Sequence, residues 1–214
     1  MGLFNFLKAK GESTQELAER VRRAESEAAQ KASQLDAMKE LVRHLDEDRL
    51  LLMRAALELK PELDPKALGE VLLDIAFKPL GLASLFIALV DWEADVISFP
   101  IYHEGGRLRN QPTLPFKGGA SGLTGKTMLA KAPLYIRTLE EGRNEGAIFS
   151  EAERISGLVP QSWYGVPLGE GRAFGLVSFQ SFHPEAFPES RRRLMDALAA
   201  ILASAFLGQL QRKG

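Results

Sequence analysis

Between Ser13 and Lys60 the chain contains neither glycine nor proline, so no residue in this long stretch is a strong helix breaker. Ser13 followed by Glu16 has the pattern of a capping box, which predicts that a helix begins there. Apolar residues then recur at alternating spacings of four and three, interrupted only by Lys31 and Arg49. They are Leu17, Val21, Ala24, Ala28, Leu35, Met38, Val42, Leu45, Leu52, Ala56 and Leu59. A narrow apolar stripe flanked by charged residues is typical of a coiled coil.

We therefore predict a coiled-coil helix over residues 13–60. A stripe this narrow offers too little apolar surface for the helix to be stable alone, which favours pairing with a second copy of the chain. The strongest part of the predicted dimer seam comprises Leu35, Met38, Val42, Leu45 and Leu52. The alternative is a single solvated helix that packs on its own domain. The same seam serves parallel and antiparallel coils; we expect a parallel homodimer.

After Pro61 the pattern changes to that of an α+β domain over residues 61–212, with one antiparallel sheet. Asp64-Pro65 predicts a helix start, because Asp is a good N-cap and Pro fits the first helical position. Short apolar runs separated by polar or glycine-containing turns predict strands and hairpins. The expected strands are 84–90, 96–103, 112–117, 133–137, 162–168 and 172–181. Helices are expected over 65–77, 121–131 and about 188–211, and Ser150 with Glu153 predicts a further short helix within 138–160.

Composition excludes several functions. The 214 residues carry a formal charge of −1, so no basic field would attract nucleic acid. The chain has no cysteine, which removes disulfides, thiolate metal sites and cysteine nucleophiles and is consistent with a reducing cytoplasm. No apolar run is long enough to span a membrane. The three histidines lie far apart in the sequence, so we predict no metal site and no cofactor.

The segment Ala120–Thr127 satisfies a loosened P-loop pattern, in which Lys126 and Thr127 would reach phosphate and magnesium. A true P-loop needs a parallel strand before it, whereas the strand expected here is short and is followed by Gly118-Gly119. The strand after it ends in Arg137 and offers no carboxylate for a metal. The segment is better explained as a tight turn that opens a helix, with Ser121 as N-cap.

The order of motifs resembles that of the GAF family of small-molecule-sensing domains. The matching segments are Gly122-Leu-Thr-Gly125, Pro133-Leu-Tyr-Ile136, Ser162-Trp-Tyr-Gly-Val-Pro-Leu168, Phe174-Gly-Leu-Val177 and Phe187-Pro-Glu-Ser-Arg191. The resemblance covers roughly residues 50 to 211 and implies an antiparallel sheet with helices on one face and loops over the other. The chain departs from the cyclic-nucleotide-binding members of the family, because Gln180-Ser181 and Arg191-Arg192 stand where those members carry Asn-Lys and Asp-Glu.

The resemblance implies a pocket on the sheet face away from the terminal helices, under residues 138–160. Candidate lining residues are Tyr102, Phe116, Leu123, Thr124, Tyr135, Arg137, Trp163 and Tyr164. These aromatic side chains are either ligand-lining or core. Alternation along a strand allows only one of Trp163 and Tyr164 to point into the pocket. Arg137 and Arg143 would be available to neutralise an anionic ligand.

Two hypotheses of function follow. In the first, the chain is a non-catalytic, cytoplasmic, dimeric module of signal transduction that binds an unknown small molecule and an unknown signalling protein. No output domain is recognised in the sequence, so we expect the output to be a separate protein. In the second, the chain is a dimeric scaffold whose GAF-like fold has lost its ligand. The flexible segment 1–12, through Leu3, Phe4, Phe6 and Leu7, is expected to contact a membrane or a partner weakly.

Overall fold

The computed structural model describes residues 13–104, 107–116 and 122–213. The predicted contacts of Leu3, Phe4, Phe6 and Leu7 therefore lie outside the described residues. The chain divides into two compact units, Met1–Arg49 and Leu50–Gly214. The division falls within the first described helix, α2 (Thr14–Glu58), and not at residue 60 as the sequence suggests.

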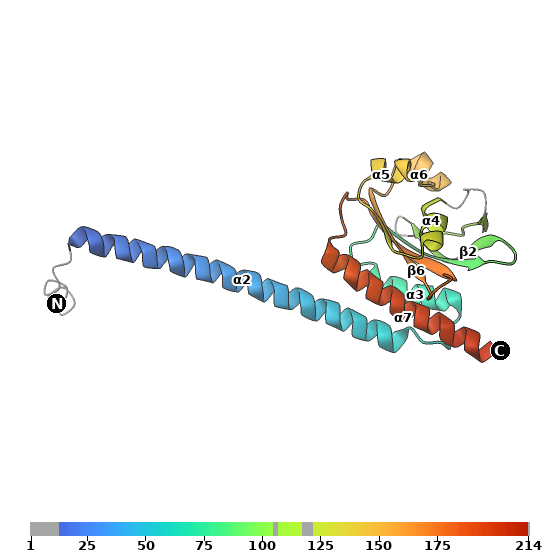
Figure 1. Ribbon diagram of the computed structural model, residues 1–214, viewed down its shortest axis with the longest axis horizontal. Coiled ribbons are helices and arrows are strands. Elements are labelled where there is room, and N and C mark those ends of the chain that lie inside the picture. Colours follow the sequence, from blue (N-terminus) through green and yellow to red (C-terminus); the bar gives the residue numbers. More distant parts are fainter. Residues whose placement is uncertain (1–12, 105–106, 117–121, 214) are drawn as a thin grey trace. The chain divides into compact units, whose positions relative to one another are not determined.

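In the first unit, α2 forms as predicted (Figure 1). Ser13 and Glu16 make both hydrogen bonds of a capping box, at 2.7 and 3.2 Å. The seam residues Leu35, Met38, Val42 and Leu45 are all exposed in the single chain. Charged side chains around them form ion pairs one turn apart, such as Lys39–Asp36 and Arg43–Glu47. The helix thus has the surface expected of a coiled-coil helix. Its pairing with a second copy of the chain stays a prediction.

The last turns of α2 belong to the second unit. Leu51, Ala55 and Leu59 are buried in the core of that unit, and Leu52 packs against the same core. Leu52 is therefore engaged within its own chain, unlike the other four seam residues. The heptad pattern alone does not show this change, because Leu52 and Leu59 resume the same spacing after the interruption at Arg49.

The second unit is built on a seven-stranded sheet in which every pairing is antiparallel. The spatial order is β3-β2-β1-β7-β6-β5, and β4 also pairs with β2. The strands are β1 (Ser84–Asp91), β2 (Val96–Glu104), β3 (Arg107–Leu108), β4 (Leu114–Pro115), β5 (Leu134–Ile136), β6 (Ser162–Leu168) and β7 (Gly175–Ser181). The hairpins β1–β2 and β6–β7 confirm the strand pairs expected from the sequence.

One face of the sheet carries the terminal helices α3 (Pro65–Ala76) and α7 (Glu189–Lys213), which lie together on the same side in Figure 1. Asp64 caps α3 by accepting a 2.8 Å hydrogen bond from the Ala67 amide, as predicted. The apolar faces of both helices meet β1, β6 and β7 in the main hydrophobic core. This core covers one face of the sheet and leaves the other face to the short helices.

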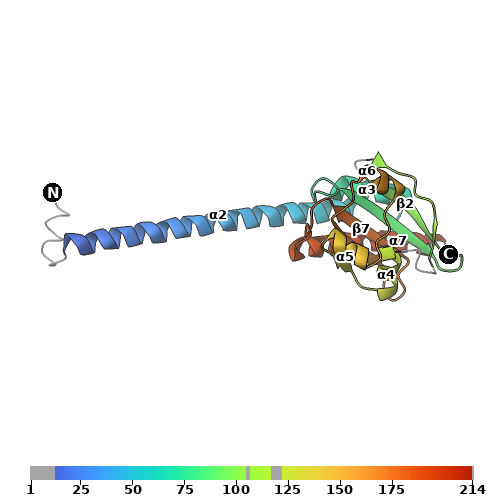
Figure 2. The ribbon, with the colours of Figure 1, turned by 90° about the horizontal axis from the view of Figure 1, so that it is seen from above.

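The opposite face carries three short helices: α4 (Gly122–Ala130), α5 (Leu139–Asn144) and α6 (Glu151–Ser156). Figure 1 shows α5 and α6 on the side of the sheet away from α3 and α7, and Figure 2 views the domain from the side of α5 and α6. The predicted long loop of 138–160 thus contains α6, which the sequence predicts, and α5, which it does not. A second, smaller hydrophobic cluster lies beneath this cover.

Candidate functional site

The aromatic cavity lies between the sheet and the covering segment 138–160. It has a volume of about 110 Å³. Its aromatic lining residues are Phe86, Phe99, Tyr102, Phe149 and Trp163. Its polar lining residues are Gln111, Thr124, Thr138, Ser150, Glu153, Gln161, Ser162 and Gln180. A mostly apolar hollow with a few converging polar groups is the usual form of a small-molecule site.

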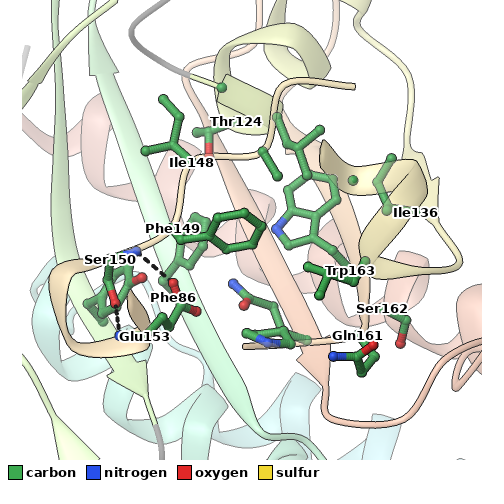
Figure 3. A pocket seen from close by; sticks show the side chains of 18 of the residues that line it. Phe86, Thr124, Ile136, Ile148, Phe149, Ser150, Glu153, Gln161, Ser162 and Trp163 are labelled. Atoms are coloured by element: carbon green, nitrogen blue, oxygen red, sulfur yellow. Dashed lines mark hydrogen bonds between the residues drawn. The ribbon is translucent and has the colours of Figure 1, made fainter. Parts of the chain in front are cut away.

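Three of the aromatic rings come from the β1–β2 hairpin. Phe86 and Tyr102 are cross-strand partners, and their rings stack with centroids 5.3 Å apart. Phe99 meets both rings edge-on, at 5.6 and 5.9 Å. Trp163 enters from β6, and Phe149 extends from the covering segment toward Trp163 (Figure 3). The cavity is therefore bounded by rings from both sheet halves and from the cover.

Ser150 organises the acidic end of the cavity. Its amide donates to Glu153 Oε2 at 2.6 Å, and its hydroxyl accepts from the Glu153 amide at 3.0 Å, which completes the predicted capping box of α6 (Figure 3). The same hydroxyl donates to Glu104 Oε1 at 2.5 Å. One serine thus holds two carboxylates: Glu153 of α6, which lines the cavity, and Glu104 of β2, which lies behind Ser150.

The two carboxylates are buried. Glu153 is 5% exposed and Glu104 is 8% exposed. Burial, reinforced by the nearby charge of Glu104, raises the pKa of the Glu153 carboxyl above its usual value, while hydrogen bonds from Ser150 partly oppose the shift. Burial also raises the pKa of the Tyr102 phenol, with smaller contributions from the charges of Glu153 and Glu104. This end of the cavity is therefore electronegative and poorly solvated.

The strand alternation around Trp163 decides which candidates line the aromatic cavity. Trp163 points into it, and its indole covers Gly165, the next residue on the same face of β6. Tyr164 points to the other face, where its hydroxyl donates to Asp196 on α7 at 2.6 Å. Tyr135, the cross-strand partner of Tyr164, packs in the same main core. Placing Tyr135 and Tyr164 among the lining residues was therefore wrong.

Of the eight candidates, the structure brings Tyr102, Leu123, Thr124 and Trp163 together around the cavity. Phe116 is buried nearby but packs edge-on against Trp92, at 4.6 Å, and does not line the cavity. Arg137 is exposed, with its Nε 3.4 Å from Glu141 Oε2. The lining role predicted for Phe116 and Arg137 was thus also wrong. Ligand binding by the other four stays a prediction.

The P-loop alternative does not fit the described part of Ala120–Thr127; Ala120 and Ser121 lie outside the described residues. Lys126 pairs with Glu145, near the end of α5. The buried Thr127 hydroxyl donates to the Leu123 carbonyl at 2.8 Å, within α4 itself. Both side chains therefore serve the packing of α4. No parallel strand pairing precedes this helix in the described sheet.

Sequence reasoning missed Phe86, Phe99, Phe149 and Glu153 as lining residues. A usable signal existed for Phe86, because the predicted hairpin of 84–90 with 96–103 places it opposite Tyr102. Glu153 was recognised as the third residue of a capping box, a role that gives no indication of a cavity. Phe149 lies in a segment without periodicity, so only the fold locates it.

Solved structures of other proteins share this architecture. The GAF domain of an Acinetobacter phosphoenolpyruvate-protein phosphotransferase matches with a TM-score of 0.63 and 16% identity, over 79% of this chain and 95% of that chain. The corresponding Coxiella burnetii domain matches with a TM-score of 0.62 and 13% identity, over 78% and 96%. The fold is that of a GAF domain. The chain thus carries a GAF fold preceded by a long helix, as its motifs suggest.

A third GAF-like neighbour is an enzyme. The free methionine-R-sulfoxide reductase of Neisseria meningitidis, solved in complex with its substrate, matches with a TM-score of 0.60 and 19% identity, over 77% and 91%. The GAF fold alone therefore does not separate sensors from catalysts. No protein-family model and no curated protein matches the sequence. Among the described residues, no helix is long and apolar enough to cross a membrane, and no group of three metal-ligating side chains occurs.

Proposed function

We propose that this chain is a non-catalytic sensory or regulatory module that binds a small molecule in the aromatic cavity of its GAF domain. In this proposal the chain acts in the cytoplasm as a parallel homodimer paired through α2, and it passes a signal to a separate protein partner. Ligand binding would favour one arrangement of the covering segment and of the helices behind the sheet.

The observation that carries the proposal is the aromatic cavity itself. It is built by rings from β1, β2 and β6 and covered by the segment that holds α5 and α6. Polar groups converge on it, and the buried Glu153 carboxylate faces it. The Glu153 carboxylate accepts the Ser150 amide in the capping box of α6, but its burial costs free energy that a cap facing solvent would avoid.

A specific observation favours the scaffold alternative. The cavity of about 110 Å³ is smaller than the roughly 300 to 1,000 Å³ of typical ligand pockets. Phe149 extends into it toward Trp163 (Figure 3). In the scaffold alternative this ring fills the site permanently, whereas in the sensory proposal it moves aside when a ligand binds.

Native mass spectrometry of the gently purified full-length protein tests the proposal. We expect the wild-type protein to carry an extra mass that leaves on collisional activation. Ala147 lines the cavity and Ala130 is exposed on α4, so Ala147→Phe should lose the extra mass while Ala130→Phe keeps it. A wild-type protein at its sequence mass, with no stabilisation by free methionine sulfoxide or a metabolite panel, would support the scaffold instead.

A further inference from the structure

We propose that the ligand of the aromatic cavity is a small organic ammonium ion. The inference rests on the proposed function and specifies its ligand class. Two features that meet in one place carry it. The first is a set of aromatic rings from three parts of the fold. The second is a buried carboxylate, for which the described residues supply no cationic partner.

The cavity lining is rich in aromatic rings, which is typical of a site for an organic cation. Phe86 and Tyr102 stack nearly parallel, at an interplanar angle of 9°, and Phe99 closes their edge. Trp163 and Phe149 bound the cavity from β6 and from the cover (Figure 3). An ammonium ion within about 6 Å of such rings is attracted by their π-electron density, and Trp is the strongest partner.

The carboxylates supply the charge. Glu153 lines the cavity and accepts a hydrogen bond from the Ser150 amide. In the described part of the chain, no Lys, Arg or His lies within ion-pair distance of its carboxylate. Glu104 stands behind Ser150, with Arg109 Nε 3.7 Å from its second oxygen. One cation near two buried carboxylates leaves net negative charge at this end. A bound ammonium ion would compensate it where water cannot.

The lining also discriminates against anions. Among the described lining residues there is no lysine, arginine or histidine, and the two arginines considered from the sequence, Arg137 and Arg143, are both exposed. A phosphate or carboxylate ligand would have to approach Glu153 without a compensating charge. The small volume of the cavity, about 110 Å³, restricts the ligand to a small headgroup.

Isothermal titration calorimetry of the full-length protein with choline tests the inference. The matched probe is 3,3-dimethylbutan-1-ol, in which a carbon replaces the ammonium nitrogen, so the two molecules share shape and differ in charge. We expect choline to bind about tenfold or more tightly than the alcohol, in line with a desolvated cation–π site. Equal affinity, or no choline binding at all, would overturn the ammonium assignment.

Glu153→Gln should weaken choline binding about tenfold and leave the affinity for the alcohol unchanged. Glutamine also serves as the third residue of a capping box, so α6 is retained. The matched control is Glu140→Gln, which removes an exposed carboxylate of the neighbouring helix α5 and should leave choline affinity unchanged.

An unchanged choline affinity in Glu153→Gln would contradict the inference. An extra mass lost in Ala147→Phe, together with equal affinities for choline and the alcohol, would retain the sensory proposal and remove only its ligand class.

Discussion

At the scale of single residues, Glu153 has the clearest functional signature. Burial and the charge of Glu104 raise the pKa of its carboxyl in the folded protein, so the folded chain binds this proton more tightly than the unfolded chain does. The stabilisation from this group is fully present below the unfolded pKa of about 4.3 and is lost as the pH rises through the folded pKa. Ionised Glu153 therefore destabilises the empty domain.

Glu153→Gln is accordingly expected to be more stable than the wild type at pH 8, with a smaller difference at pH 4. Urea unfolding at both pH values, followed by Trp fluorescence, measures the two free-energy differences. Glu140→Gln removes a charge outside the cavity and should not become more stable than the wild type at pH 8. A Glu153→Gln variant that is less stable than the wild type at pH 8 would show that the carboxylate stabilises the fold, contrary to the argument.

Trp163 and Tyr164 show how far the sequence alone predicts which side chains line the cavity. Alternation along β6 correctly requires Trp163 and Tyr164 to face opposite sides of the sheet, but it does not say which one faces the cavity. The structure decides through neighbours distant in sequence: Asp196 accepts from the Tyr164 hydroxyl, and Gly165 leaves room for the Trp163 indole. A Cβ at position 165 would lie 1.9 Å from that indole. Gly165 was a readable signal for the side of Trp163, whereas Asp196 was not.

At the scale of elements, α6 depends on one side chain. The Ser150 hydroxyl caps the helix and donates to Glu104, so Ser150→Ala removes both hydrogen bonds. We expect a loss of about 1–2 kcal/mol in the stability of the covering segment. Hydrogen exchange should accordingly become about 5- to 30-fold faster at the amides of α6.

The matched control is Ser204→Ala on α7. Its exposed hydroxyl donates to the Ala200 carbonyl within its own helix, and its loss should leave exchange in α6 unchanged. Faster exchange across the whole sheet in Ser150→Ala would contradict a local role for this serine. Unchanged exchange in α6 would show that Ser150 does not hold the cover.

The elements predicted from the sequence are those with a strong local signal. Capping patterns locate the starts of α2, α3 and α6, and the change from helical to strand periodicity locates the hairpins. The six-residue helix α5 is too short to show a periodicity. It nevertheless begins with Thr138 and Glu141, the spacing of a capping box, and the Thr138 hydroxyl accepts from the Glu141 amide at 3.2 Å. The capping pattern was thus present in the sequence, but no apolar repeat followed it to indicate a helix.

At the scale of the whole molecule, the heptad stripe of α2 lies in two different environments. Beyond Arg49 its residues Leu52 and Leu59 pack in or against the core of the GAF domain, whereas Leu35, Met38, Val42 and Leu45 are exposed. The apolar spacing alone does not separate the two environments, since Leu52 and Leu59 keep the spacing of the residues before Arg49. The first four seam residues therefore carry the prediction of dimerisation.

We expect the full-length protein to sediment as a dimer at micromolar concentration. In a parallel coil Val42 and Leu45 would each face their counterparts, so Val42→Glu/Leu45→Glu places like charges in the seam and should weaken association at least tenfold. Ala37→Glu, on the opposite side of the stripe, should sediment like the wild type. Both variants should retain the near-UV circular dichroism of the GAF domain, because its core contains none of these residues. A monomeric wild type, or a double variant that stays dimeric at the same concentration, would show that α2 does not hold two chains together.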